Sequence, residues 1–354
     1  SISWLRRGGM RVNPESIIES WHNNEDLSLI QKMRDDLGWT SWLAVAEIAL
    51  LYGSPLVDVL RDEMSAAENA VLDLVVMRIA GEVSISDVEK ALAVVRDPEQ
   101  RDLLLEGRLR MEAGLIRFES EDFEQAREDF SWAETRLKSV AKASREHDIA
   151  LINKAAFHLA LDEPLMALQV YGDISRKDGH ADETIAISRM NAARILLAFD
   201  RIYEALRNSF IAHIHAIIAE NIALAIESGA IFIEIALPHI EQDAARMKEQ
   251  LANAKPRDAE EEEIKPAIHP EDMEGVLSWC VEKATIDIGG NQRGDLKALL
   301  ILCERAKRLD FFNHTLQRSG EVEDVEFANL CYALTESEEW STRISELAAL
   351  EANF

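Results

Sequence analysis

One run of ionisable side chains has the spacing of a possible metal site. C-terminal to His213, glutamates recur every seven residues: Glu220, Glu227, Glu234 and Glu241. On one unbroken helix they would form a stripe, and a histidine with two carboxylates is a donor set that binds divalent cations. Gly229 and Pro238 predict a broken helix, however, and charges at this spacing are typical of the solvated face of a packed helix. The sequence therefore predicts no metal and no cofactor.

A glycine-rich segment, residues 288–295, precedes an apolar run. Backbone amides of such a turn can hold a phosphate at a helix N-terminus. The segment has no lysine of the phosphate-loop type, and the motifs of zinc proteases, serine hydrolases and dinucleotide-binding domains do not occur in the chain. We therefore interpret it as an ordinary loop between two helices and assign no catalytic residue.

Cysteine usage bears on the compartment. Cys280, Cys303 and Cys331 are odd in number, form no CxxC pair and are flanked by apolar residues. They are predicted to be small buried hydrophobic residues in a reducing, cytoplasmic environment. The apolar stretch 211–237 contains three glutamates, which favours a buried pair of soluble helices over a membrane span.

The charge balance excludes whole classes of partner. The chain has 38 Lys and Arg against 65 Asp and Glu, a net charge of −27. Nucleic acids and anionic membranes attract proteins through Lys and Arg, so both would repel this surface. We expect instead a protein or peptide that presents basic residues around an apolar anchor. The oligomeric state is left open.

Helical spacing dominates the chain that must position these residues. With 15 glycines and 8 prolines in 354 residues, there are too few turn residues for a strand-rich fold. The pattern predicts more than about 60% helix and almost no strand. Helix starts are expected at Ser86–Asp87, near Asp182 and at Asp272.

An internal repeat provides the strongest signal. Segment 113–133 places small and aromatic residues around a marker alanine, Ala126, and the marker recurs as Ala167 and Ala205. The spacings are 41 (167 − 126) and 38 (205 − 167) residues. This pattern resembles the tetratricopeptide (TPR) repeat, whose unit is about 34 residues. Pro164 occupies the expected first turn of a second helix. Weaker units are centred on Ala91 and within 217–252.

The resemblance implies an all-α fold, a right-handed α-solenoid of TPR-like helical hairpins with helical N- and C-terminal extensions. Three prolines and the run Glu260–Glu263 mark an exposed linker. The expected organisation is an N-terminal helical cap, a TPR-like repeat array, an acidic proline-containing linker and a C-terminal helical extension, over residues 1–74, 75–254, 255–271 and 272–354.

The resemblance further implies a binding function. Its concave face would be lined by the first helix of each hairpin, here by a groove set of Met111, Leu115, Phe118, Asn153, Ala156, Asn191, Arg194 and Leu197. In peptide-binding members an asparagine at the place of Asn153 and Asn191 contacts the ligand backbone, although the full carboxylate clamp is missing here. We expect a non-catalytic protein- or peptide-binding scaffold. The alternatives are a regulatory sensor of a small molecule or signalling peptide, and an enzyme with a carboxylate-based site.

Overall fold

The computed structural model describes residues 14–36, 39, 41–253, 272–286, 288, 293–316 and 318–351. The fold is 80% helical, and the described residues contain no strand, which confirms the predicted all-α class. Neighbouring helices pack closely, in a manner compatible with a helical repeat. The predicted linker 255–271 and residues 289–292 of the glycine-rich segment lie outside the described residues.

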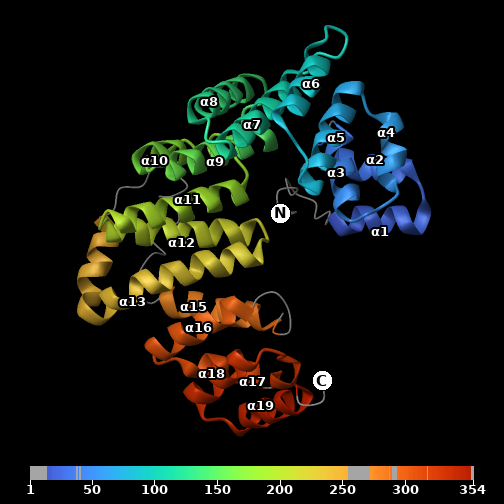
Figure 1. Ribbon diagram of the computed structural model, residues 1–354. Coiled ribbons are helices and arrows are strands. Elements are labelled where there is room, and N and C mark those ends of the chain that lie inside the picture. The colour runs from blue at the N-terminus through green and yellow to red at the C-terminus, as the bar shows by residue number, and fades with distance from the viewer. Residues whose placement is uncertain are drawn as a thin grey trace. The chain divides into compact units, whose positions relative to one another are not determined.

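Contacts between helices divide the chain into two compact units, Ser1–Ala181 and Asp182–Phe354, a division that falls inside the predicted repeat array (Figure 1). The helices of the first unit are α1 (Pro14–Asn24), α2 (Leu27–Asp36), α3 (Leu43–Leu51), α4 (Leu56–Glu63), α5 (Ala66–Ala80), α6 (Ile85–Arg96), α7 (Leu103–Glu119), α8 (Phe123–Val140), α9 (Arg145–Ala160) and α10 (Pro164–Gly172). Those of the second unit are α11 (Asp182–Ala198), α12 (Ile202–Ile218), α13 (Ile222–Asn253), α15 (Asp272–Ile286), α16 (Arg293–Arg305), η3 (Leu309–Phe312), α17 (Asn313–Leu316), η4 (Ser319–Glu321), α18 (Val325–Thr335) and α19 (Glu338–Glu351).

Short polar side chains fix several helix starts. Ser65 caps α5 and Ser84 caps α6, each in a capping box with the acidic residue three positions later. Such a cap satisfies backbone N–H groups that lack a partner in the first turn. Ser84 lies two residues before the start that the sequence predicted. The starts of α11 at Asp182 and of α15 at Asp272 agree with the prediction.

The same turn closes three successive hairpins. Glu121, Asp162 and Asp200 adopt the left-handed backbone conformation, with φ of 62°, 58° and 57°. Each residue lies five positions before a marker alanine, so the turns recur with the spacing of the sequence repeat. The residue after each donates its N–H to the carbonyl five positions earlier: Asp122 to Arg117, Glu163 to His158 and Arg201 to Leu196. Left-handed backbone is uncommon outside glycine. The same turn also occurs at Glu220 and Lys307, where Asn221 donates to the Ala216 carbonyl and Arg308 to the Cys303 carbonyl.

Small side chains allow the helices of a hairpin to approach each other. Ala126 and Ala133 on α8 are fully buried, and Phe130 between them packs in the same core cluster. A Cβ atom added to Gly114 of α7 would lie 3.3 Å from ring atoms of Phe130. The short turn and the extensive contact make α7 and α8 antiparallel. The other two marker alanines are also fully buried, and Pro164 begins α10 as predicted.

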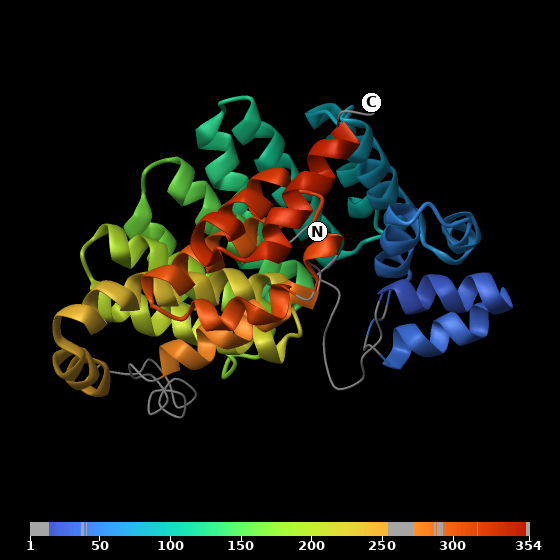
Figure 2. The same cartoon turned by 90° about the horizontal axis from the view of Figure 1, so that it is seen from below.

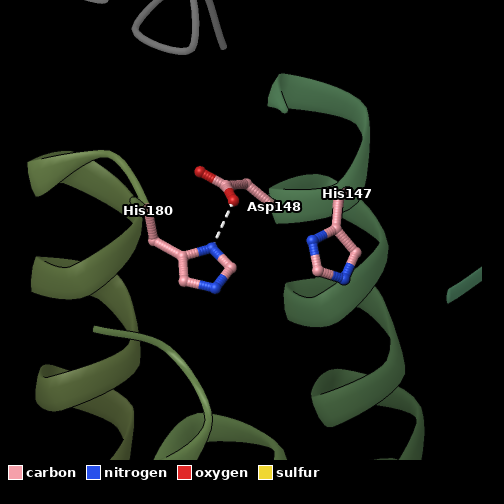
Figure 3. A group of neighbouring side chains, drawn as sticks. All are labelled: His147, Asp148 and His180. Atoms are coloured by element: carbon pink, nitrogen blue, oxygen red, sulfur yellow. Dashed lines mark hydrogen bonds and ion pairs between the residues drawn. The ribbon is translucent and has the colours of Figure 1, made fainter. Parts of the chain in front are cut away.

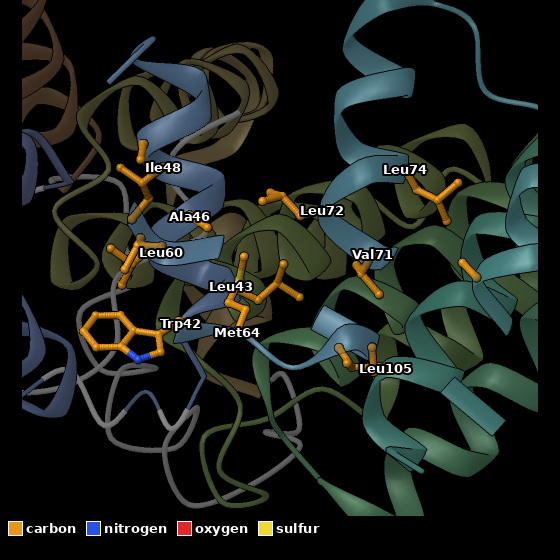
Figure 4. Packing of buried hydrophobic residues seen from close by; sticks show 14 of the residues in the cluster. Trp42, Leu43, Ala46, Ile48, Leu60, Met64, Val71, Leu72, Leu74 and Leu105 are labelled. Carbon is orange, nitrogen blue, oxygen red and sulfur yellow. The ribbon is translucent and has the colours of Figure 1, made fainter. Parts of the chain in front are cut away.

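The first six helices share a core with α7, and Figure 4 shows the part of it that α3, α4, α5 and α7 contribute. Helix α3 contributes Val45, Ala46 and Ile48, which are fully buried, and α7 contributes Leu105 and Leu109. Burying a large aliphatic side chain stabilises a fold by about 1.5–3 kcal/mol. The N-terminal helices are therefore held to the first hairpin by ordinary hydrophobic packing.

A buried glutamate also joins three helices of this unit. Glu47 on α3 is 7% exposed, pairs with Arg108 of α7, and lies 3.3 Å through its Oε2 from Nη1 of Arg145 at the start of α9. Burial alone would raise the pKa of Glu47, but the two guanidinium groups lower it below its ordinary value. The carboxylate is therefore charged at neutral pH and links α3 to both hairpins.

Helix α13 corrects the predicted break. It runs without interruption from Ile222 to Asn253, so the expectation that Gly229 and Pro238 end the helix was wrong. In Figure 1 the last part of α13, drawn in gold, changes direction from the first part, as expected of an internal proline. His213 lies on α12, so the heptad stripe is divided between elements. The side chain of Glu241 lies outside the described residues.

The helices α15 to α19 gather into one orange-to-red group in Figures 1 and 2. All three cysteines are free and buried, as predicted, and burial raises the pKa of Cys303 and of Cys331 to about 12. Within the described ranges, none of the helices combines the length and the apolar character that crossing a bilayer requires.

Candidate functional site

Part of the predicted groove set lies on α7 and α9 of the first unit: Met111, Leu115, Phe118, Asn153 and Ala156. The two helices are in contact, and Asn153 Nδ2 donates a hydrogen bond to Met111 Sδ over 3.3 Å. Met111 is 6% exposed and belongs to the core, whereas Ala156 is exposed. Half-buried Phe118 packs edge-on against Phe157, with ring centroids 5.7 Å apart. The structure thus joins Asn153 to Met111, which lies in the core, and packs Phe118 against the residue that follows Ala156.

The rest of the groove set lies on α11 of the second unit. Arg194 donates hydrogen bonds to Asn191 Oδ1 over 3.1 Å and to Glu227 Oε1 over 2.5 Å. Leu197 is 42% exposed. Glu227 of the predicted stripe is thus an ion-pair partner on an exposed surface. Pairs of this kind contribute at most about 1 kcal/mol, so they are easily exchanged for a ligand contact.

A cluster of three buried ligand-type side chains lies elsewhere in the first unit (Figure 3). His147 and Asp148 stand in the first turn of α9, behind the capping residue Ser144. His180 ends the segment between α10 and α11, where Gly179 adopts a φ of 89° that favours glycine. The three side chains are each 2% exposed, and one ligand atom from each lies within 4.8 Å of the others.

Hydrogen bonds fix the two histidine rings. His180 Nδ1 lies 2.6 Å from Asp148 Oδ1, and the Ala181 N–H donates to Oδ2 over 3.3 Å. The Ala143 N–H donates to His147 Nδ1 over 3.0 Å, so this nitrogen carries no proton. The proton of the neutral His147 ring therefore resides on Nε2. The ring centroids of the two histidines are 5.6 Å apart.

A carboxylate stands on the far side of the His147 ring. Glu134 Oε1 lies 3.8 Å from Nε2, which has no hydrogen-bond partner among the described residues. Lys154 Nζ lies 3.2 Å from Glu134 Oε2. The His147 ring first, and then the Lys154 ammonium, lower the pKa of Glu134 to about 2 against the effect of burial. Glu134 is therefore an ionised carboxylate that faces the Nε2–H group of His147.

Sequence reasoning missed this cluster, because His180 is 33 residues (180 − 147) from His147 and no motif connects them. The available signal was modest: a His-Asp pair just after a helix cap, and a lone histidine after a glycine. Two buried imidazoles and a buried carboxylate can bind a metal ion. Alternatively, the His180–Asp148 pair can share a proton and so hold the segment before α11 in place.

No model of a known protein family matches the chain, and neither a curated protein nor a solved structure proves similar to it. Its function has to be inferred from its own residues and contacts. The two candidate functional sites are the groove set and the His147–Asp148–His180 cluster.

Proposed function

We propose that the protein is a non-catalytic scaffold that binds a protein or peptide through TPR-like hairpins. The observation that carries this proposal is the recurrence of one turn at Glu121, Asp162 and Asp200, each followed five residues later by a fully buried alanine. Equivalent turns and equivalent small contacts are expected when one supersecondary unit is repeated. Repeats of this kind present the first helix of each hairpin to a ligand.

The chemistry of the groove set supports a peptide ligand. In the first unit, α7 carries half-buried Leu115 and Phe118, and the neighbouring helix α9 carries Asn153 and exposed Ala156. Partly exposed apolar side chains and an amide can offer an apolar anchor contact and a hydrogen-bond partner to a peptide. Asn191 and Arg194 supply comparable polar groups on α11 of the second unit.

The net charge of −27 favours a ligand of positive charge. A basic peptide is attracted over the whole approach, whereas an acidic one is repelled. We therefore propose a ligand with Lys and Arg residues around an apolar anchor. Salt should slow its association more than it weakens the final complex, because the anchor contact itself is apolar.

A displayed peptide library of mixed charge tests the proposal on the full chain. Selected peptides should be basic with an apolar residue, and Ala156→Arg should weaken their binding at least tenfold or so by adding bulk and positive charge. The matched control is Glu128→Gln, which changes the net charge equally at an exposed position of α8 and should bind as the wild type does.

Circular dichroism of both variants establishes that the helices are retained. Selection of no peptide, selection of acidic peptides, or equal binding by Ala156→Arg and the wild type would each overturn the proposal for the first unit. A Leu197→Arg variant extends the same test to α11, where Leu197 is 42% exposed and its replacement should not disturb packing.

A further inference from the structure

We infer that His147, Asp148 and His180 form a binding site for a divalent transition-metal ion, with Zn²⁺ as its foremost occupant. The site belongs to the first unit and does not depend on the groove set. In the proposed state the ion replaces the proton shared by His180 Nδ1 and Asp148 Oδ1, and His147 Nδ1 supplies the third protein ligand. A water molecule takes the fourth position of a tetrahedron.

The three donor atoms already converge. They lie within 4.8 Å of one another, and the His180–Asp148 pair is 2.6 Å apart. Ligands of a tetrahedral zinc ion are about 3.3 Å apart, given bonds of about 2.0–2.2 Å. The His180–Asp148 pair must therefore open by about 0.7 Å, and the His147 nitrogen must move inward by up to about 1.5 Å (Figure 3). Because His147 and Asp148 are adjacent in the first turn of α9, this movement requires side-chain rotation as well as a shift of the helix.

The surroundings of His147 fit a metal ligand better than a purely structural ring. A ligating histidine usually donates its other N–H to a carboxylate, which fixes the ring and increases its basicity. Glu134 is placed for this role, 3.8 Å from a buried Nε2 that makes no hydrogen bond among the described residues. Lys154 in turn orients Glu134. The cost of metal binding is the hydrogen bond from the Ala143 N–H to Nδ1, which the ion would replace.

The donor set selects the metal. Two imidazole nitrogens and one carboxylate oxygen suit zinc, cobalt and nickel, whereas magnesium and calcium prefer oxygen ligands alone. The absence of a thiolate in the cluster disfavours copper(I). Residues 176–179 next to His180 are exposed, so the path from solvent to the cluster is short.

Equilibrium dialysis of the full chain against Zn²⁺ tests the site directly. The wild type should take up a single tightly bound ion and melt at a higher temperature with zinc than without. With Co²⁺ it should show the intense visible absorption of four-coordinate cobalt. His180→Gln and Asp148→Asn should lose the uptake and the cobalt spectrum. Glu134→Gln should keep the spectrum but bind roughly 10–100-fold more weakly.

The matched control is His158→Gln. His158 lies on the same helix, is 4% exposed and also faces a carboxylate, with its Nδ1 2.7 Å from Glu163 Oε2. It should bind zinc as the wild type does. Failure of the wild type to take up zinc overturns the inference, and so does equal loss in His158→Gln and His180→Gln. If circular dichroism shows that His180→Gln does not fold, the wild-type dialysis and the more conservative Asp148→Asn variant decide the matter.

Discussion

Two helical glycines of the second unit allow a sharp test of the packing around α13. Gly229 lies where α13 meets α12 and α15, and a Cβ added there would be 2.7 Å from Cys280 Sγ and 2.9 Å from His213 Nδ1. Contacts of this kind prefer about 3.5–4.0 Å, so neighbouring groups must move. His213 is held by its 2.7 Å hydrogen bond to the Ala225 carbonyl, and Cys280 is fully buried. Moving either group would therefore disturb a buried hydrogen bond or buried packing.

The magnitude follows from two opposed terms. Replacing a helical glycine by alanine gains about 1 kcal/mol in helix propensity. Overpacking a rigid contact costs about 1–3 kcal/mol or more. We expect Gly229→Ala to lower the free energy of unfolding of the second unit by up to about 2 kcal/mol. Gly275 of α15 is the matched control, because a Cβ there meets nothing within 4 Å. Gly275→Ala should raise the free energy of unfolding by up to about 1 kcal/mol.

Urea unfolding followed by circular dichroism measures both variants, and hydrogen exchange localises the change to the junction of α12, α13 and α15. The opposite signs are the essential result, because both substitutions add the same methyl group to a helix. A Gly229→Ala variant as stable as Gly275→Ala would refute the close approach of these helices, and with it the position of His213.

Two further predictions concern charged and titrating groups. Glu47→Gln removes a buried carboxylate shared by two arginines and should lower the free energy of unfolding in urea by about 3–5 kcal/mol. Asp35→Asn, which removes an exposed carboxylate paired with Arg34, should lower it by less than about 0.5 kcal/mol. Similar losses in the two variants would contradict a buried, shared Glu47 carboxylate. Burial lowers the pKa of His213 below its ordinary value of 6.5, against the hydrogen bond to Ala225. The unfolded ring then takes up a proton before the folded ring does, so stability should fall as the pH falls through 6.5, and a His213→Gln variant titrated from about pH 7.5 to 5.5 should show a smaller loss.

The helical class was predictable because it depends on local information. Apolar spacing and the scarcity of turn residues act within a few turns of chain, as do the acidic first turn of α11 at Asp182 and the proline that begins α10 at Pro164. The break predicted in α13 failed for the opposite reason. An internal proline costs about 3 kcal/mol locally, and tertiary contacts of α13 with α12, α15 and α16 offset this cost.

The His147–Asp148–His180 cluster was beyond sequence reasoning for a geometric reason. The position of His180 depends on the path of the segment after α10, which returns to the start of α9. Gly179 in that segment has a left-handed backbone, but the sequence alone does not show that this turn places His180 beside Asp148. The groove set came from a resemblance, which gives positions on a helix but not burial. This explains why Met111, placed correctly on α7, lies in the core.

The described ion pairs also change how the composition should be interpreted. The carboxylates of Glu47, Asp129 and Glu106 are buried, and each is paired with one or two arginines of the same unit. Asp129 shows the cost, because burial raises its pKa despite two guanidinium neighbours. Arginines engaged in these pairs are not available to neutralise other carboxylates. Five arginines are paired with these three buried carboxylates, so the acidic excess of the chain resides in its other side chains, which supports the proposal of a basic ligand.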